Sequence, residues 1–103
     1  MPHVTTFRFS TLPGKRDEVV SLMDEWASAE QSNAPGIQEY SLIASNDEPD
    51  EWMAYVRFDT TENYMKNSDR PAQDAWFKRL RELLKADPEW FNGTIAIAIE
   101  SSE

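Results

Sequence analysis

The order of hydrophobic and polar positions changes its period several times along the chain. Apolar and polar residues alternate, as they do in β-strands, in residues 4–11, 37–44, 51–59 and 94–100. Helical spacing occupies residues 15–30, and a second helical region that bends near residues 68–70 lies between the third and fourth strands. The pattern predicts the order strand, helix, strand, strand, broken helix, strand.

Local signals set the ends of the predicted helices. The first helix carries acidic residues in its first turn and one apolar stripe, formed by Val19, Leu22, Met23, Trp26 and Ala29. Asp59 is expected to cap the second helix, with Glu62 three residues later in a capping box. Pro71 suits the first turn of the segment that follows the bend.

These elements predict an α+β fold of the ferredoxin-like, split βαβ type. Four antiparallel strands form one sheet, and the helices lie on one of its faces. A length of 103 residues fits a single domain, so residues 1–103 are taken as one unit.

Strand alternation sorts the residues of the predicted sheet into two faces. The face expected under the helices is nearly all apolar: Phe7, Phe9, Tyr40, Leu42, Trp52, Ala54, Val56, Phe58, Ile95, Ile97 and Ile99. The other face is mixed: Thr6, Arg8, Glu39, Ser41, Ile43, Met53, Tyr55, Arg57, Ala96 and Ala98. The mixed face is read either as a homodimer interface or as an ordinary solvated surface.

Two large aromatic residues stand side by side in RPAQDAWFKRL, residues 70–80. Phe77 lies one position off the apolar stripe of this helix, which is formed by Ala72, Trp76, Leu80, Leu83 and Leu84. Both side chains can belong to the core, or the helix can roof a pocket with an aromatic lining.

Composition narrows the possible functions. The chain has 19 acidic and 10 basic residues, a net charge of −9, so nucleic acid is not an expected partner. It has no cysteine and one histidine, His3, read as a strand-start residue; neither a metal site nor a Ser-His-Asp triad is expected. With no apolar run long enough for a membrane span and no recognisable signal peptide, a cytoplasmic protein without membrane association is expected.

Three segments together resemble the antibiotic biosynthesis monooxygenase (ABM) family. They are PGIQEYSL, EWMAYVRFDTTENYMKN and NSDRPAQDAWFKRLRELLKADPEWFNG. The resemblance extends over residues 4–99 and implies a dimeric α+β barrel, in which two ferredoxin-like subunits join through their sheets. It also implies, for the oxidising members, oxygen chemistry on quinols, anthrones and similar aromatics without metal or flavin.

The resemblance also implies a site between the sheet and the helices. Hydroxyl, amide and aromatic side chains there would stabilise a deprotonated substrate. On this chain, the catalytic candidates are Asn67 and Tyr64, and the substrate-binding candidates are Trp26, Tyr40 and Trp76. Many catalytic relatives have a histidine in the helix after the third strand, where this chain has Asn67. Haem degradation, which relies on a helical histidine, is therefore disfavoured.

Each candidate also has a structural interpretation. Asn67 can be an exposed residue at a helix end, and the two tyrosines can simply pack in the core. Asp74 can interact favourably with the helix dipole, or act as a base if it is buried. Two functions follow. One is a cofactor-independent monooxygenase acting on a small quinol- or anthrone-like aromatic molecule. The other is a non-catalytic dimeric barrel that binds a small molecule or has a structural role. A closed pocket with convergent polar groups would favour the first.

Overall fold

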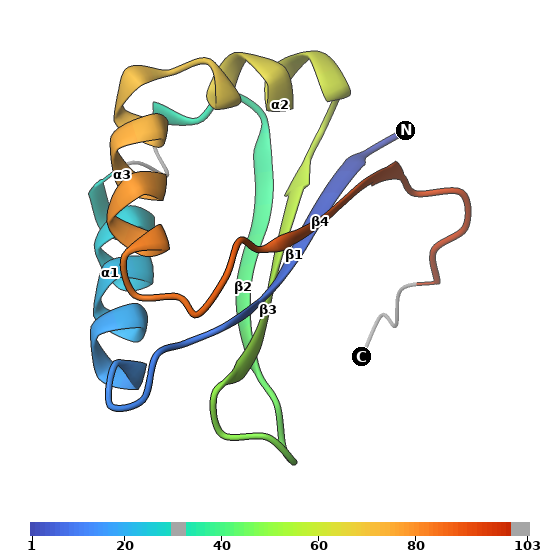
Figure 1. The fold of residues 1–103 in the computed structure, drawn as a ribbon. Helices are drawn as coiled ribbons and strands as arrows, with labels where there is room; N and C mark the ends of the chain where they lie inside the picture. Colours follow the sequence, from blue (N-terminus) through green and yellow to red (C-terminus); the bar gives the residue numbers. More distant parts are fainter. Residues whose placement is uncertain (30–32, 100–103) are drawn as a thin grey trace.

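The computed structural model describes residues 1–29 and 33–99, which form one four-stranded antiparallel sheet with three helices (Figure 1). The strand order is β2-β3-β1-β4. Along the chain the elements are β1 (His3–Ser10), α1 (Arg16–Ala29), β2 (Ile37–Ala44), β3 (Glu51–Phe58), α2 (Thr61–Ser68), α3 (Pro71–Arg81) and β4 (Glu89–Thr94). The predicted fold class is confirmed.

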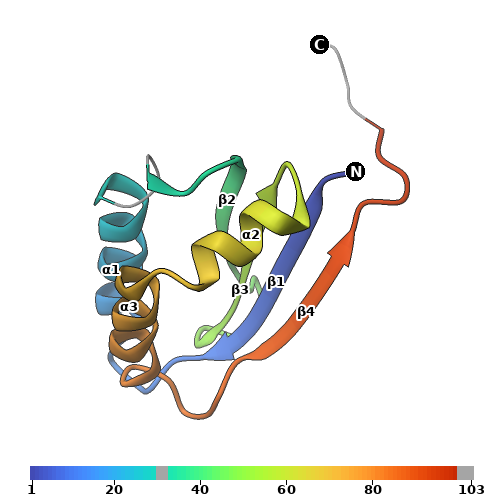
Figure 2. The same cartoon turned by 90° about the horizontal axis from the view of Figure 1, so that it is seen from above.

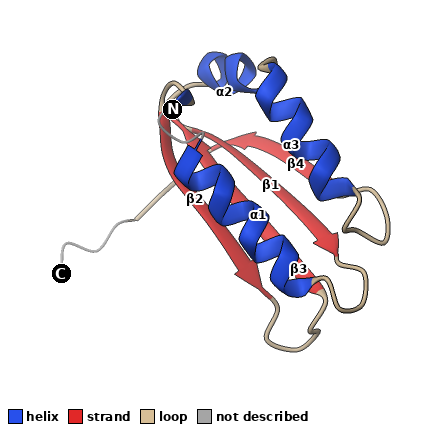
Figure 3. Ribbon diagram, turned by 90° about the vertical axis from the view of Figure 1, so that its left-hand side faces the viewer, coloured by secondary structure: helices blue, strands red, loops and turns tan. Residues whose placement is uncertain are grey.

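All three helices lie on the same side of the sheet. Helices α1 and α3 run side by side over its face, and α2 crosses near one end of the strands (Figures 2 and 3). Arg79 of α3 donates two hydrogen bonds to the carboxylate of Glu25 on α1, and these bonds lower the pKa of Glu25. Among the described residues, no helix is long and apolar enough to cross a membrane.

The core lies between the helices and the face of the sheet that was predicted to be apolar. Phe7 and Phe9 of β1 are buried there, as are four residues of β3: Trp52, Ala54, Val56 and Phe58. The helices contribute most of their predicted stripes to the same cluster: Val19, Leu22, Met23, Trp26, Trp76 and Leu80. Ala29 and Ala72 are exposed, and Leu83 and Leu84, which also pack against the core, follow the end of α3 at Arg81. The alternation read from the first three strands therefore assigns their faces correctly.

The last strand lies earlier in the chain than predicted. It comprises Glu89–Thr94, not residues 94–100, and pairs with β1 from Glu89 opposite Arg8 to Thr94 opposite His3. Strand β1 begins at His3, so β4 has no strand residue to pair with beyond that point. One further backbone hydrogen bond follows, from the N–H of Ile95 to the carbonyl of Pro2. Pro88 and Gly93 made the true strand resemble a loop in sequence.

The predicted core residues of that segment are consequently misplaced. Ile95 is half-buried, whereas Ile97 and Ile99 are 87% and 95% exposed. Ala96 and Ala98 are also exposed, in a chain segment that leads away from the sheet (Figure 1). The predicted ends at residues 30 and 100 lie outside the described residues.

The cap of α2 is one residue later than predicted. Thr60 is the N-cap, and its hydroxyl accepts from the backbone N–H of Asn63. Asp59 instead accepts from the side chain of Asn63. A threonine hydroxyl competes with the neighbouring aspartate for the same capping position, and sequence alone does not rank them. Pro71 begins α3, as predicted.

Replacing Trp76 with alanine should strongly destabilise the protein. Trp76 is only 7% exposed, and its loss leaves a large cavity among α1, α3 and the sheet. We expect a cost of about 3–5 kcal/mol in the free energy of unfolding, measured by chemical denaturation. Trp90→Ala is the matched control, because Trp90 is 47% exposed and its loss should cost less. Equal denaturation midpoints for wild type and Trp76→Ala would contradict this packing.

Candidate functional site

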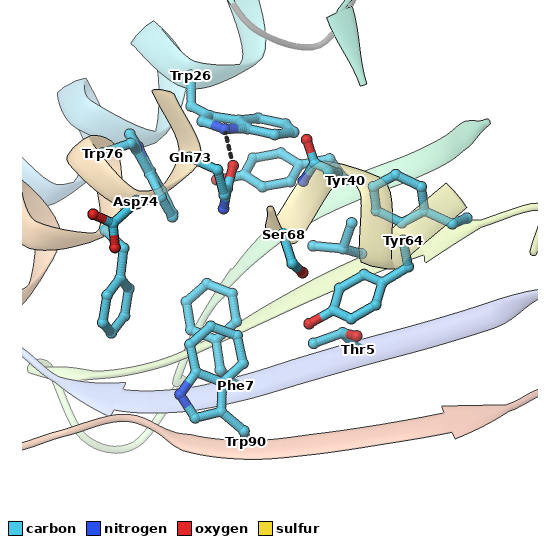
Figure 4. Close-up of a pocket in the computed structure, with 14 residues that line it drawn as sticks. Thr5, Phe7, Trp26, Tyr40, Tyr64, Ser68, Gln73, Asp74, Trp76 and Trp90 are labelled. Atoms are coloured by element: carbon cyan, nitrogen blue, oxygen red, sulfur yellow. Dashed lines mark hydrogen bonds between the residues drawn. The ribbon is translucent and has the colours of Figure 1, made fainter. Parts of the chain in front are cut away.

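A cavity of about 210 Å³ lies between the helices and the sheet (Figure 4). Its floor is the core face of the four strands, and its roof comes from α1, α2 and α3. All five candidates chosen from the sequence line it: Trp26, Tyr40, Tyr64, Asn67 and Trp76. Their placement around one cavity is a finding, while their chemical roles stay predictions.

Aromatic rings form most of the wall. Trp26 stacks on Tyr40, with ring centroids 4.8 Å apart, and is tilted against Trp76 at 6.1 Å. On the opposite side, the ring centroids of Trp90 and Phe7 lie 4.6 Å apart. A cavity between such rings suits a flat apolar molecule.

The neighbouring aromatics Trp76 and Phe77 have different partners. Trp76 is buried against α1, where its indole N–H donates to the backbone carbonyl of Leu22. Phe77 is half-buried and faces Trp90, with ring centroids 5.7 Å apart. Both line the cavity, so Trp76 is a core residue and a wall residue at once. The two readings of RPAQDAWFKRL are compatible.

Asn67 is not an exposed residue at the helix end. Its side chain is buried, at 5% exposure, near the C-terminus of α2. Arg70 donates to its Oδ1 at 2.9 Å, which fixes the orientation of the carboxamide. The charged donor holds the oxygen and leaves the amide nitrogen as the group that Asn67 can offer to a ligand.

Gln73, which sequence reasoning missed, has a similar arrangement. The indole N–H of Trp26 donates to its Oε1 at 2.8 Å, and its amide nitrogen points away from Trp26 (Figure 4). Gln73 stands three residues before Trp76, so the two share one face of α3. The three-residue spacing from Trp76 was the one feature of the sequence that could have indicated Gln73 as a cavity residue. Two carboxamides whose oxygens already accept hydrogen bonds therefore line the helix side of the cavity.

The two tyrosines differ in what their hydroxyls do. The Tyr40 hydroxyl donates to Sδ of Met23 at 2.6 Å, and burial raises the pKa of Tyr40 far above its ordinary value. Tyr40 thus contributes its ring and remains neutral. The Tyr64 hydroxyl has no hydrogen-bond partner in the described part of the chain, and it is directed into the cavity on the side of Thr5 and Phe7 (Figure 4). Only Tyr64 presents a phenol to a ligand.

Asp74 lies at the rim of the cavity and is not buried. Its side chain is 65% exposed and pairs with Lys78 at 3.1 Å, one helical turn later. It also stands in the first turn of α3, where the helix dipole favours a carboxylate. The structural interpretation of Asp74 therefore holds, since the burial required of a base is missing.

His3 is far more than a strand-start residue. It is 4% exposed, and its ring stacks on Tyr64 with centroids 4.3 Å apart. Its Nδ1 lies 3.2 Å from the Thr61 hydroxyl and its Nε2 lies 2.8 Å from the Thr5 hydroxyl. Thr5 in turn donates to Oδ1 of Asn92. The position of His3 near the start of the sequence gave no indication of this hydrogen-bond network.

Acidic and imidazole groups do not gather anywhere in the described ranges, 1–29 and 33–99, in a way that could hold a metal ion. The polar side chains that line the cavity are mostly neutral donors: the amides of Asn67 and Gln73 and the hydroxyls of Thr5, Tyr64 and Ser68, with the carboxylate of Asp74 at the rim. Neutral donors in an aromatic cavity are suited to stabilising an oxyanion on a flat ring.

The fold and cavity define a class: a ferredoxin-like α+β protein with an aromatic pocket between its helices and its sheet. The sequence model for the family described as "Antibiotic biosynthesis monooxygenase" matches residues 2–79. The chain belongs to this family, and the resemblance noted in the sequence is confirmed. No match is found among curated proteins.

Several solved structures share the fold. SnoaB, a cofactor-independent oxygenase from Streptomyces nogalater, solved as the mutant N63A, has a TM-score of 0.86 at 17% identity, covering 97% of this chain and 98% of that one. A conserved protein from Methanosarcina mazei Go1 has a TM-score of 0.83 at 14% identity, with coverages of 90% and 91%. Rv0793 from Mycobacterium tuberculosis has a TM-score of 0.79 at 20% identity, with coverages of 99% and 100%. At these identities the likeness shows a common fold.

Proposed function

We propose that the protein is a cofactor-independent monooxygenase that acts on a small aromatic molecule of the quinol or anthrone kind. The observation that carries the proposal is the aromatic cavity, which is lined by neutral hydrogen-bond donors. Membership of the monooxygenase family and the fold shared with SnoaB, which is named a cofactor-independent oxygenase, support the reaction class.

The enclosed volume bears on substrate size. Pockets for drug-sized ligands usually measure about 300–1,000 Å³, and this cavity has about 210 Å³. A small quinol therefore fits this volume better than a three-ring anthrone, which would extend beyond it. The rings of Trp26 and Tyr40 on one side and Phe7 on the other would hold the flat substrate.

The proposed chemistry begins with loss of a proton from the substrate. An electron-rich aromatic anion can give electrons directly to oxygen, so the protein's task is to hold that anion in place. The amide of Asn67 and the hydroxyl of Tyr64 would donate to the developing oxyanion, while Trp26, Tyr40 and Trp76 would exclude water. When an anthrone CH₂ is oxidised to a carbonyl, or a quinol to a hydroxyquinone, one oxygen atom enters the product and the other leaves as water with two hydrogens of the substrate.

We also propose a homodimer joined through the outer faces of the two sheets. On this face Phe91 is 68% and Ile43 49% exposed, and the register places Phe91 in one row with Thr6 and Tyr55. The Nε of Arg57, on the same face, is buried without a hydrogen-bond partner. A second subunit would supply the acceptor that a buried cationic donor needs.

The segment after β4 supports the same interface. Ile97 and Ile99 alternate with alanines and are almost fully exposed as the chain leaves the sheet. Exposed alternating apolar residues have the composition of a strand that lacks its neighbour. The partner subunit would cover Ile97 and Ile99. Their exposure in the single chain would then reflect the missing partner.

Replacing Asn67 with alanine should lower oxygen consumption about a hundred- to thousandfold, the usual cost of removing one oxyanion donor. The measurement is oxygen uptake with a panel of quinols and anthrones, with no added metal or flavin. Asn63→Ala is the matched control, because Asn63 lies on the same helix, bonds to Asp59 and does not line the cavity.

Unchanged uptake in Asn67→Ala would remove Asn67 from the mechanism. If the wild type takes up no oxygen with any member of the panel, the monooxygenase proposal fails. Binding of the same molecules without turnover would then favour the second function, a small-molecule-binding module.

Light scattering should give a mass of about twice the 11.9 kDa of one chain at micromolar concentration. Phe91→Glu should raise the dimer dissociation constant about tenfold or more, because an unpaired polar group in the interface costs about 1–3 kcal/mol. Met65→Glu is the control, since Met65 is a similarly exposed apolar residue, but on α2. A monomeric wild type would refute the proposed interface.

A further inference from the structure

The chain has one histidine, and it lies directly behind the phenol of the cavity. His3 is 4% exposed, and its imidazole ring is nearly parallel to the ring of Tyr64, with an interplanar angle of 21° and centroids 4.3 Å apart. Phe58 contacts Tyr64 edge-on at 5.6 Å. The Tyr64 ring is thus held between two fixed rings, with its hydroxyl in the cavity.

Both ring nitrogens of His3 face hydroxyl groups on different elements. Thr61 of α2 lies at Nδ1, and Thr5 of β1 lies at Nε2. Since Thr5 donates its own proton to Asn92, Nε2 is the donor in the Thr5 contact. The Thr61 hydroxyl can donate to a neutral ring at Nδ1 or accept from a protonated one. The site therefore accommodates both charge states of the imidazole without moving a heavy atom.

We propose that His3 is a positioning residue whose charge sets how strongly Tyr64 donates to a bound oxyanion. A cation stacked on a phenol ring is attracted to its electron density, and more strongly when negative charge develops on the phenol oxygen. The imidazolium form of His3 therefore makes Tyr64 a stronger donor. The strength of the Tyr64 donor would therefore change as the imidazole of His3 gains or loses its proton.

Other ionisable groups around His3 do not supply this effect. The residues opposite His3 are Phe58 on β3 and Thr94 on β4, and the neutral Asn92 bonds to Thr5. Within the described residues, the ionisable side chain shown in contact with the His3 ring is Tyr64. Asp59 accepts from Asn63, and Glu62 pairs with Lys66 at 3.5 Å on the exposed side of α2. The other nearby charge in the sequence is the exposed N-terminal ammonium of Met1.

This inference rests on the proposed binding of an aromatic oxyanion, and it is tested by binding, without turnover. The probe is 2-hydroxy-1,4-naphthoquinone, which is already oxidised and stays anionic over the range studied. Quenching of the fluorescence of the cavity tryptophans reports its binding. Wild type should bind it about two- to fivefold more tightly near pH 5 than near pH 8, the contribution of a cation–aromatic contact.

We call this difference in probe affinity between pH 5 and pH 8 the pH step. Three variants identify its source. His3→Gln keeps a donor for Thr5 without a titrating charge, and His3→Phe keeps a stacked ring. Both should bind the probe with no step. Tyr64→Phe keeps His3 and removes the hydroxyl, so it should also lose the step. A step that persists in the His3 variants or in Tyr64→Phe overturns the inference, as does a wild type that shows no step or does not bind the probe.

A second measurement needs no variant. Because the chain has a single histidine, its imidazole proton signals in an NMR spectrum are assigned without ambiguity. By linkage, probe binding must move the His3 titration to higher pH by the same two- to fivefold factor in proton affinity. An unmoved titration overturns the inference. A pH step without any oxygen uptake would instead refute the proposed monooxygenase and leave the role of His3 intact.

Discussion

The break between α2 and α3 is the constraint on which the cavity depends. Pro71 cannot continue a helix from the residue before it, and Arg70 accordingly has an extended backbone, with φ −72° and ψ 133°. The roof over the sheet is therefore two short helices meeting at an angle. Asn67 and Ser68 come from the end of one, and Gln73, Asp74, Trp76 and Phe77 come from the start of the other. A continuous helix would carry these groups around its own axis and leave no common cavity.

The same break explains the polarity of the site. Arg70, the residue at the break, donates to the oxygen of Asn67, and Trp26 donates to the oxygen of Gln73. With both carboxamide oxygens occupied, the roof presents N–H groups, and the phenol of Tyr64 adds an O–H from α2. An aromatic cavity with neutral donors strengthens each interaction with a bound anion, because little water competes inside it. No imidazole on a helix is required for that.

Much of this arrangement was readable in the sequence, for identifiable reasons. Two periodic signals are strong: the alternation in the first three strands, and the apolar stripes of the two helices that carry Trp26 and Trp76. They assigned most of the core correctly. The last strand was misplaced because residues 94–99 alternate more regularly than the true strand, whose position depends on where β1 ends. That is a tertiary constraint, which a local pattern does not contain.

The polar part of the site was predicted less completely. Asn67 and Tyr64 were reached through the family resemblance, and the structure places both on the cavity. Gln73 was missed because it reads as a surface residue until its partner Trp26 is placed over it. His3 was missed because two of its three ring and hydroxyl neighbours, Tyr64 and Thr61, lie on α2, which is distant in sequence. The third, Thr5, is linked in turn to Asn92 of β4. Contacts of this kind follow from the fold and leave no periodic trace.

The most direct test of the account is a crystal structure of the protein with 2-hydroxy-1,4-naphthoquinone bound. The account predicts the flat ring in the cavity, between the Trp26–Tyr40 pair and Phe7, with a ligand oxygen within hydrogen-bond distance of the Asn67 amide nitrogen and the Tyr64 hydroxyl. An empty cavity in crystals that hold the ligand elsewhere, or a ligand in the cavity with its oxygens turned away from both donors, would contradict it.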